Sequence, residues 1–199
     1  MFTHRYDHTN RETRLATLPP GCDDVGQWTY ELTELTKLVA ELHPTRILEL
    51  GTYRGGTLYS WLTVLEPGGT CYTIDDREPL ALWQGWAYTR GVTTVNWQGD
   101  THTPEMLKLA TEHAPYDFLF IDANHTEAGV TADFMDYGPL VRPGGLIAFH
   151  DIKDPAPHRG QDHIRVSRLW KRIQEAGYKT RELVTHPDEA WGGIGVVFV

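Results

Sequence analysis

The chain has 199 residues, and its length and charge already limit what it can be. Against about 150 residues per domain, this length predicts one domain that is large enough to bury a proper core. Lys and Arg number 18 and Asp and Glu number 27, which gives a net charge of −9. Because this balance disfavours a surface that binds nucleic-acid phosphates or anionic lipid, we expect neither nucleic acid nor a membrane as a partner.

The sequence shows no targeting, anchoring or disulfide signal. Its first thirty residues lack the apolar run of a signal peptide, and nowhere do about 18 apolar residues follow one another. Cys22 and Cys71 are far apart and form no C-x-x-C motif, so neither a disulfide framework nor a thiolate zinc site is indicated. We therefore expect a cytoplasmic protein.

The first residues predict an arm or lid ahead of the domain. Residues 1–25 are polar, lack periodicity and contain a Pro-Pro-Gly break, which leaves a domain over 26–199. From Gln27 to Leu42, apolar residues recur at three- and four-residue steps, which is typical of a helix with one buried face. His43-Pro44 ends this helix.

Strand-like apolar runs then alternate with helix-length stretches. Strands are predicted over 46–50, 70–75, 93–98, 117–122, 145–150 and 193–199. Helices are predicted near 56–65, 79–90, 103–113, 126–138 and 162–176. This alternation predicts an α/β fold: a single Rossmann-like, doubly wound, mostly parallel sheet with helices on both faces and an antiparallel last strand.

Acids and glycines occupy the positions where such a sheet binds ligands. Ligands bind outside the carboxyl ends of the strands, so the residues that end or follow each strand are the functional candidates. In chain order these are Glu49 to Gly56, Asp75-Asp76, Gly99-Asp100, Asp122 to His125 and His150-Asp151.

The glycine-rich segment after the first strand has the pattern E-x-G-x-x-x-G-G. It differs from the G-x-G-x-x-G of dinucleotide-binding folds. Glu49 would repel a pyrophosphate but suits a ligand that carries an ammonium or a sulfonium. Asp75 closes the second strand where an acid takes ribose hydroxyls, and its neighbour Asp76 is the less favoured candidate. A tight turn without a ligand is the alternative interpretation.

Together, this loop and acid resemble the S-adenosylmethionine site of class I methyltransferases, and the resemblance extends over about residues 25–199. It implies S-adenosylmethionine as the cofactor. Asp75 would hold the ribose, and Gly99 and Asp100 would lie by the adenine; Asp100 also suits the cap of a helix before Pro104. The predicted cofactor-binding residues are Glu49, Gly51, Thr52, Tyr53, Gly55, Gly56, Thr57, Asp75, Asp76, Gly99, Asp100 and Asp122.

The acids after the fourth and fifth strands predict a metal site of Asp122, His150 and Asp151. If these strands are neighbours, the three residues converge beside the methyl group of the cofactor. Mg²⁺ prefers hard oxygen ligands, and such an ion would lower the pKa of a bound hydroxyl and aim its oxygen at the methyl carbon. The alternative is that the acids only cap the following helix and loop.

The surrounding motifs, F-I-D-A-N-H-T-E-A-G-V-x-x-D and L-V-R-P-G-G-L-I-A-F-H-D-I, resemble one branch of this family. It holds the cephalosporin hydroxylase-like and macrolide-sugar O-methyltransferase proteins, which use Mg²⁺ and often self-associate, so a homo-oligomer is expected. That branch tends to show two acids after the fifth strand, whereas the first here is His150. Because His ligates Mn²⁺, Fe²⁺, Zn²⁺ or Ni²⁺ more readily than Mg²⁺, the site would hold another ion such as Mn²⁺, or His150 would act as a base without one.

Asp122, His125 and His150 are the predicted catalytic residues. His125 suits the role of proton acceptor from a substrate hydroxyl, since an unperturbed His titrates near ~6.5, but it also suits a place behind the metal ligands or local packing. His158 and His163, in a lid-like stretch over 152–163, compete for the role of base. Lys153 is rated lower, because its unperturbed pKa near ~10.4 needs a large shift.

The predicted function is transfer of the methyl group of S-adenosylmethionine to a hydroxyl oxygen of a small molecule, such as a sugar or a phenolic natural product. One alternative is a cofactor-binding protein of the hydroxylase-like branch without methyl transfer of its own, and another is a sensor without catalysis. An NAD-dependent dehydrogenase is the remaining rival for the glycine loop. Trp97 and Trp191 are predicted near adenine or substrate, and Trp61, Trp83, Trp86 and Trp170 are predicted in the core.

Overall fold

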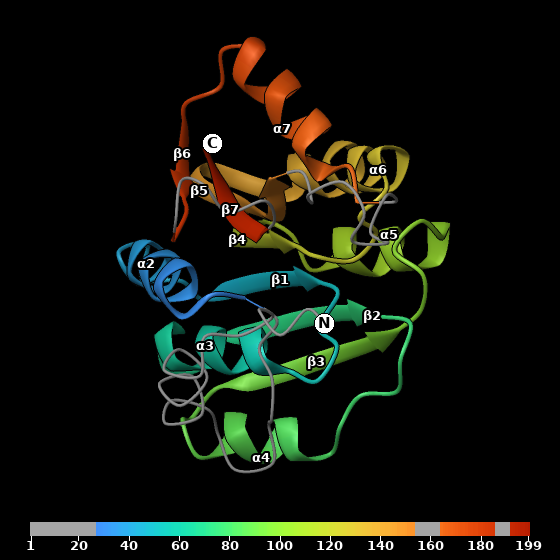
Figure 1. Ribbon diagram of the computed structural model, residues 1–199. Helices are drawn as coiled ribbons and strands as arrows, with labels where there is room; N and C mark the ends of the chain where they lie inside the picture. The colour runs from blue at the N-terminus through green and yellow to red at the C-terminus, as the bar shows by residue number, and fades with distance from the viewer. Residues whose placement is uncertain (1–26, 154–163, 186–191) are drawn as a thin grey trace, which may run out of the picture.

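The computed structural model describes residues 27–153, 164–185 and 192–199, and shows a sheet flanked by helices (Figure 1). The predicted arm over 1–25 lies outside the described residues, and so do most of the lid stretch, His158, His163 and Trp191. In the described part of the chain, no helix has both the length and the apolar character needed to cross a bilayer.

Helices and strands alternate along the chain as predicted. In chain order they are α2 (Thr29–Ala40), β1 (Arg46–Leu50), α3 (Gly56–Val64), β2 (Thr70–Asp75), α4 (Leu82–Tyr88), β3 (Thr93–Gln98), α5 (Pro104–Glu112), β4 (Tyr116–Ile121), α6 (Glu127–Tyr137), η1 (Gly138–Leu140), β5 (Val141–Lys153), α7 (Val166–Glu175), β6 (Thr180–Leu183) and β7 (Gly192–Phe198). Of these described elements, β6 and the short η1 were not predicted. Only one of the four side chains of β6 is buried, so no apolar run marks it.

The seven strands form one sheet in the order β3-β2-β1-β4-β5-β7-β6. Strands β1 to β5 pair in parallel, and β7 pairs antiparallel with both β5 and β6. The predicted doubly wound sheet with an antiparallel last strand is confirmed. The winding direction switches between β1 and β4, so their carboxyl ends flank the crevice where such sheets bind ligands.

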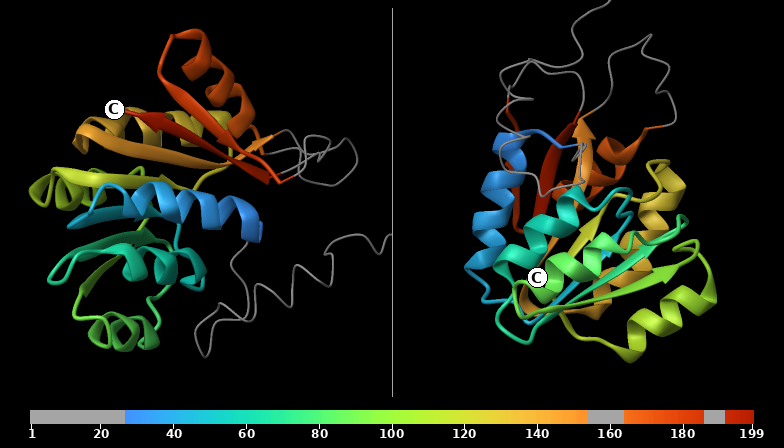
Figure 2. Two further views of the ribbon diagram at one scale, coloured as in Figure 1. Left: turned by 90° about the vertical axis from the view of Figure 1, so that its left-hand side faces the viewer. Right: turned by 90° about the horizontal axis from the view of Figure 1, so that it is seen from below.

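Two apolar cores cover the two faces of the sheet. Helices α2, α3 and α4 cover one face and α5, α6 and α7 the other (Figure 2). Trp61 and Trp83 are buried in the first core and Trp170 in the second, as predicted, and Trp86 also belongs to the first. Burial on both faces explains why the strands read as continuous apolar runs.

The amino ends of three strands are joined by one carboxylate. Asp117 Oδ2 accepts hydrogen bonds from the backbone N–H groups of Thr45 (2.7 Å) and Arg46 (2.9 Å), and its Oδ1 accepts one from Arg142 Nε at 2.6 Å. Burial alone would raise the pKa of Asp117, but these donors hold it below its usual value. This clamp on β1, β4 and β5 lies at the end of the sheet opposite to the carboxyl ends.

Candidate active site

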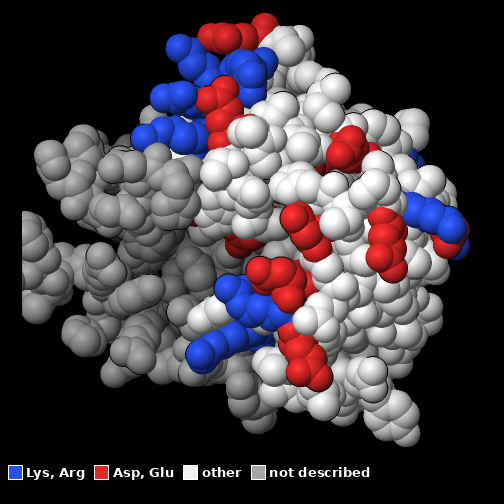
Figure 3. Space-filling view, turned by 90° about the vertical axis from the view of Figure 1, so that its right-hand side faces the viewer, with Lys and Arg blue, Asp and Glu red and all other residues white. Residues whose placement is uncertain are grey.

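A cavity of about 790 Å³ opens at the carboxyl ends of the parallel strands, a volume within the range of small-molecule and cofactor sites. Figure 3 shows the face toward which β1, β2 and β3 point in Figure 1; basic side chains gather at its top, over α7. Most predicted site residues line this cavity. They are Gly51, Thr52, Tyr53, Gly56, Thr57, Asp75, Asp76, Gly99, Asp100, Asp122, His125, His150 and Asp151.

The glycine loop after β1 is pressed against the end of β4. Gly51 has a φ of +82° and donates its N–H to the carbonyl of Ile74 at 2.8 Å. A Cβ at this position would overlap the carbonyl oxygen of Asp122 and lie 2.6 Å from its carbonyl carbon. Glycine is therefore required here for two reasons, the left-handed backbone and the close approach to β4.

Asp75 fixes the other side of this loop. Its Oδ2 accepts hydrogen bonds from the backbone N–H groups of Thr52 and Tyr53, both at 2.7 Å, and its Oδ1 accepts one from Arg77 N at 2.9 Å. The carboxylate lines the cavity but is nearly buried, while Asp76 lines it and is exposed. Asp75 therefore holds the loop in shape, and its contact with a ribose stays a prediction.

Glu49 and Gly55 support the loop from beneath and do not line the cavity. Glu49 is fully buried and its Oε1 accepts a hydrogen bond from Trp61 Nε1 at 2.7 Å. Burial raises the pKa of Glu49 to about 7, so its charge is suppressed. A Cβ on Gly55 would meet the indole of Trp83. One oxygen of Glu49 is thus taken by a contact with α3, and the predicted contact of Glu49 with a cationic ligand stays a prediction.

A distortion in β5 brings His150 and Asp151 together. Neighbouring side chains on a regular strand point to opposite faces. Asp151 instead has a φ of +58°, and the register of β5 with β7 shifts between His150 and Lys153. As a result both side chains are buried in the cavity wall, with His150 Nδ1 3.6 Å from Asp151 Oδ1.

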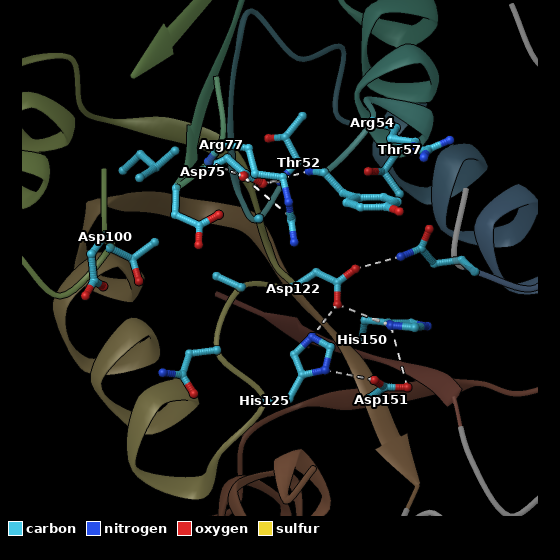
Figure 4. A pocket seen from close by; sticks show the side chains of 18 of the residues that line it. Thr52, Arg54, Thr57, Asp75, Arg77, Asp100, Asp122, His125, His150 and Asp151 are labelled. Carbon is cyan, nitrogen blue, oxygen red and sulfur yellow. Dashed lines mark hydrogen bonds and ion pairs between the residues drawn. The ribbon is translucent and has the colours of Figure 1, made fainter. Parts of the chain in front are cut away.

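Two carboxylates and two imidazoles form one cluster, as Figure 4 shows. His125 Nε2 lies 3.0 Å from Asp122 Oδ1, and its Nδ1 lies 3.1 Å from Asp151 Oδ2. His150 Nδ1 lies 3.2 Å from the same oxygen of Asp122. The structure therefore brings together Asp122, His150 and Asp151, which were predicted to converge after strands four and five, and adds His125 to them.

The four groups hold one another in charged form. Burial alone would raise the pKa of Asp122 and lower those of the two imidazoles, but the ion pairs and hydrogen bonds outweigh it. The pKa of Asp122 falls to about 2, that of His125 rises to about 11 and that of His150 to about 9. In this arrangement the raised pKa of His125 favours the protonated ring, and its role as a proton acceptor stays a prediction.

The predicted metal ligands meet, but His125 stands between them. Each of its two ring nitrogens contacts one carboxylate oxygen, Nε2 that of Asp122 and Nδ1 that of Asp151. Within residues 27–153, 164–185 and 192–199, no group of three His, Cys, Asp or Glu side chains is arranged to hold a metal ion. The donors Asp122, His150 and Asp151 are thus close together without forming an open ligand set.

Several lining residues were missed by the sequence analysis. Gln27 Nε2 donates a hydrogen bond to Asp122 Oδ2 at 2.7 Å, and no pattern marks this glutamine, because it only precedes an amphipathic helix. Arg54 and Arg77 lie at the mouth of the cavity with their guanidinium groups 5.4 and 4.8 Å from the centre of the Tyr53 ring (Figure 4).

Trp97 does not line the cavity, contrary to the expectation that it touches adenine or substrate. It packs on the outer part of the sheet, with its ring centre 5.4 Å from that of Tyr72 and 5.3 Å from that of His113. The last side chain on β3 before the turn is Gln98, and the Gly99-Asp100 turn itself lines the cavity.

The methyltransferase-domain family matches residues 48–152, which run from β1 through the cluster on β5 and make up more than half of the chain. The chain belongs to this family. The match includes the glycine loop, Asp75 and all four members of the cluster, so the family relationship covers most of the cavity wall of this methyltransferase, while Gln27, Lys153 and Ile164 lie outside it.

A curated relative and several solved structures are similar to this methyltransferase. Protein y4gI of Sinorhizobium fredii is 28% identical over 127 residues, which is 58% of this chain; the chain spans only 14% of that protein. An O-methyltransferase from Bacillus cereus in complex with SAH has a TM-score of 0.62 at 22% identity, covering 99% of this chain and 94% of that one.

Two further structures share the fold. The O-methyltransferase TomG from Streptomyces achromogenes, involved in tomaymycin synthesis and in complex with SAM, has a TM-score of 0.64 at 17% identity, covering 100% of this chain and 99% of that one. MycE from the mycinamycin biosynthetic pathway, in complex with Mg, SAH and mycinamycin VI, has a TM-score of 0.59 at 22% identity, covering 83% of this chain and 48% of that one. At these identities the likeness concerns the fold.

Proposed function

We propose that this methyltransferase moves the methyl group of S-adenosylmethionine to a hydroxyl oxygen of a small molecule. The observation that carries this proposal is the position of the Asp122, His125, His150 and Asp151 cluster in the same cavity as the glycine loop held by Asp75. The SAM, SAH and mycinamycin VI in the similar structures support the cofactor and a small-molecule acceptor. We propose a sugar or a phenolic compound as that acceptor.

The residues of the cavity divide the task between them. The glycine loop would surround the amino-acid end of the cofactor, Asp75 and Asp76 the ribose, and Gly99 and Asp100 the adenine. In the transfer, the acceptor oxygen bonds to the methyl carbon, the carbon–sulfur bond breaks, S-adenosylhomocysteine (SAH) leaves and the hydroxyl proton is lost.

The cluster would orient the acceptor hydroxyl, and the proton would leave to solvent. The carboxylates of Asp122 and Asp151 lie in the cavity wall and would accept the hydrogen bond of that hydroxyl. His150 would donate its Nε2–H to the acceptor oxygen; this atom is buried and has no partner within the described chain. His125 would hold the two carboxylates in place between its ring nitrogens.

Calorimetry with SAH and with NAD tests the proposed cofactor. We expect SAH to bind at least ten-fold more tightly than NAD, because the loop after β1 lacks the G-x-G-x-x-G pattern that lets a backbone approach the pyrophosphate of NAD. Tighter binding of NAD would reject the assignment. With the cofactor identified, SAH formation from S-adenosylmethionine over a panel of sugars and phenols would then find the acceptor.

We further propose that a divalent metal ion assists the transfer. Asp122, His150 and Asp151 would hold it once His125 leaves its place between the carboxylates. His150 Nδ1 lies 3.2 and 3.6 Å from the two carboxylate oxygens, near the separation of about 3 Å between adjacent ligands at bond lengths of about 2.1 Å. The ion would supply a Lewis acid that lowers the pKa of the acceptor hydroxyl. One imidazole in the set suits Mn²⁺ better than Mg²⁺.

Removal of metal tests this part separately. Treatment with a chelator is expected to lower the initial rate of SAH formation at least ten-fold, and Mn²⁺ is expected to restore it better than Mg²⁺. Binding should also release protons, because protonated imidazole is not a ligand. An unchanged rate after chelation would exclude the metal and leave the methyltransferase assignment standing.

The second candidate function is cofactor binding without methyl transfer. The protonation of both imidazoles favours it, because neither ring is then a base at neutral pH. It predicts tight SAH binding together with no SAH formation from S-adenosylmethionine on any acceptor of the panel, with or without Mn²⁺. Measured turnover with one acceptor would exclude it.

A further inference from the structure

The side-chain amide of Gln27 is fixed in one orientation by Asp122. Its nitrogen lies 2.7 Å from Asp122 Oδ2. A carboxylate oxygen accepts hydrogen bonds, and the other oxygen of Asp122 already lies 3.0 Å from His125 Nε2 and 3.2 Å from His150 Nδ1. The amide nitrogen must therefore face Asp122, and the amide oxygen must point away from it.

This amide oxygen is buried, and none of the residues that the structure describes donates to it. Gln27 is 3% exposed, and its Oε1 has no hydrogen-bond partner in the part of the chain that the structure describes. A buried carbonyl oxygen without a donor is unfavourable, and native proteins rarely leave one unless a ligand or water completes it. Since Gln27 lines the cavity, a bound ligand is the natural source of that donor.

The neighbours of Gln27 indicate which end of the cofactor it meets. Asp122 N donates to the carbonyl of Leu50 at 2.8 Å, and the backbone of Gly51 is packed against the carbonyl of Asp122. Gln27, Asp122 and the glycine loop are therefore adjacent parts of one wall. The proposed function places the amino-acid end of S-adenosylmethionine at this loop.

That end offers an ammonium group, which only donates, and a carboxylate, which only accepts. The carbonyl oxygen of Gln27 lies beside the carboxylate of Asp122. Together they repel the carboxylate of the cofactor and attract its ammonium group. We infer that Gln27 Oε1, together with Asp122, binds the α-ammonium group of the methionine part of the cofactor. This inference rests on the proposed function and adds to it a binding residue that sets where the sulfonium, and hence the methyl group, lies.

Binding of two ligands to two variants tests the inference without a known acceptor. SAH carries the amino acid, and 5′-methylthioadenosine has the same nucleoside and sulfur without it. Gln27→Met removes both hydrogen bonds at similar volume, and Gln27→Lys keeps a donor for Asp122 but replaces the carbonyl by a cation. We expect both variants to lose about ten-fold or more in SAH affinity, with Lys losing more, because each lacks a contact to a charged group.

The affinity for 5′-methylthioadenosine should stay within two-fold in Gln27→Met and Gln27→Lys. This result would also show that the nucleoside part of the cavity is intact in both variants. Gln174→Met, on α7 outside the cavity, is the matched control and should leave both affinities unchanged. Equal loss of both ligands, or unchanged SAH affinity in both variants, would overturn the inference while the wild-type protein still binds SAH. If the wild-type protein binds neither ligand, the proposed function fails and the inference fails with it.

Discussion

Asparagine in place of Asp122 is expected to reduce methyl transfer about a thousand-fold or more and to lower the free energy of unfolding by about 3 kcal/mol. Asp122 balances the charges of His125 and His150, and its side chain is only 14% exposed. Without its charge, two imidazoles share the single carboxylate of Asp151, and one buried group must lose its proton or its partner. The loss of one member of a buried ion pair typically costs about 3 to 5 kcal/mol.

The measurements are the initial rate of SAH formation and the unfolding midpoint in urea. Asp136→Asn, at an exposed position on α6, is the matched control and should change neither. Asp151→Ala separates chemistry from cofactor binding, because Asp151 contacts His125 and His150 but not Gln27. It should abolish transfer and keep SAH affinity within a few-fold. An Asp122→Asn protein with wild-type rate and stability would show that the cluster is not the reaction centre.

Alanine in place of Gly51 is expected to eliminate measurable SAH binding. The new Cβ would overlap the backbone of Asp122, which cannot move aside because its N–H is bonded within the sheet to Leu50. The loop must therefore shift away from β4, and this shift would break the hydrogen bonds that Thr52 N and Tyr53 N donate to Asp75. A shift of this kind changes the wall against which the cofactor lies.

Gly68→Ala is the matched control for this change. Gly68 has almost the same φ, +81° against +82°, but nothing lies within 4 Å of the Cβ it would gain. Both variants should lose about 1 to 2 kcal/mol of stability from the left-handed backbone, and only Gly51→Ala should lose more than that and fail to bind SAH. Calorimetry and urea unfolding measure the two effects. Equal behaviour of the two variants would mean that close packing on β4 is unimportant for binding.

The approximate position of the site could be predicted from the sequence. Asp75, Asp122 and Asp151 lie at or near the carboxyl ends of apolar runs, and parallel strands deliver such residues to one edge of a sheet. That His150 and Asp151 meet was predictable only from their positions in the motif. The left-handed φ of Asp151, which makes both side chains face the cluster, has no sequence signal, because most left-handed positions are glycine.

Contacts between side chains account for what the sequence did not reveal. Whether Glu49 faces a ligand or the core depends on Trp61, which lies beyond the glycine loop on α3 and supplies a buried donor. Whether His125 accepts a proton or links two carboxylates depends on the distance between Asp122 and Asp151, which come from different strands. Gln27 belongs to no periodic pattern, and only its contact with Asp122 distinguishes it from any other polar residue before a helix.

The clamp formed by Asp117 contributes to stability at one end of these strands, and the reaction takes place at the other end. It ties β1, β4 and β5 at their amino ends, whereas the cavity lies at their carboxyl ends. Changes at Asp117 or Arg142 would make the protein heat-labile without altering what it recognises when cool. Conversely, the specificity of the cavity has room to diverge over evolutionary time, because the residues that fasten these three strands together are not the residues that touch a ligand.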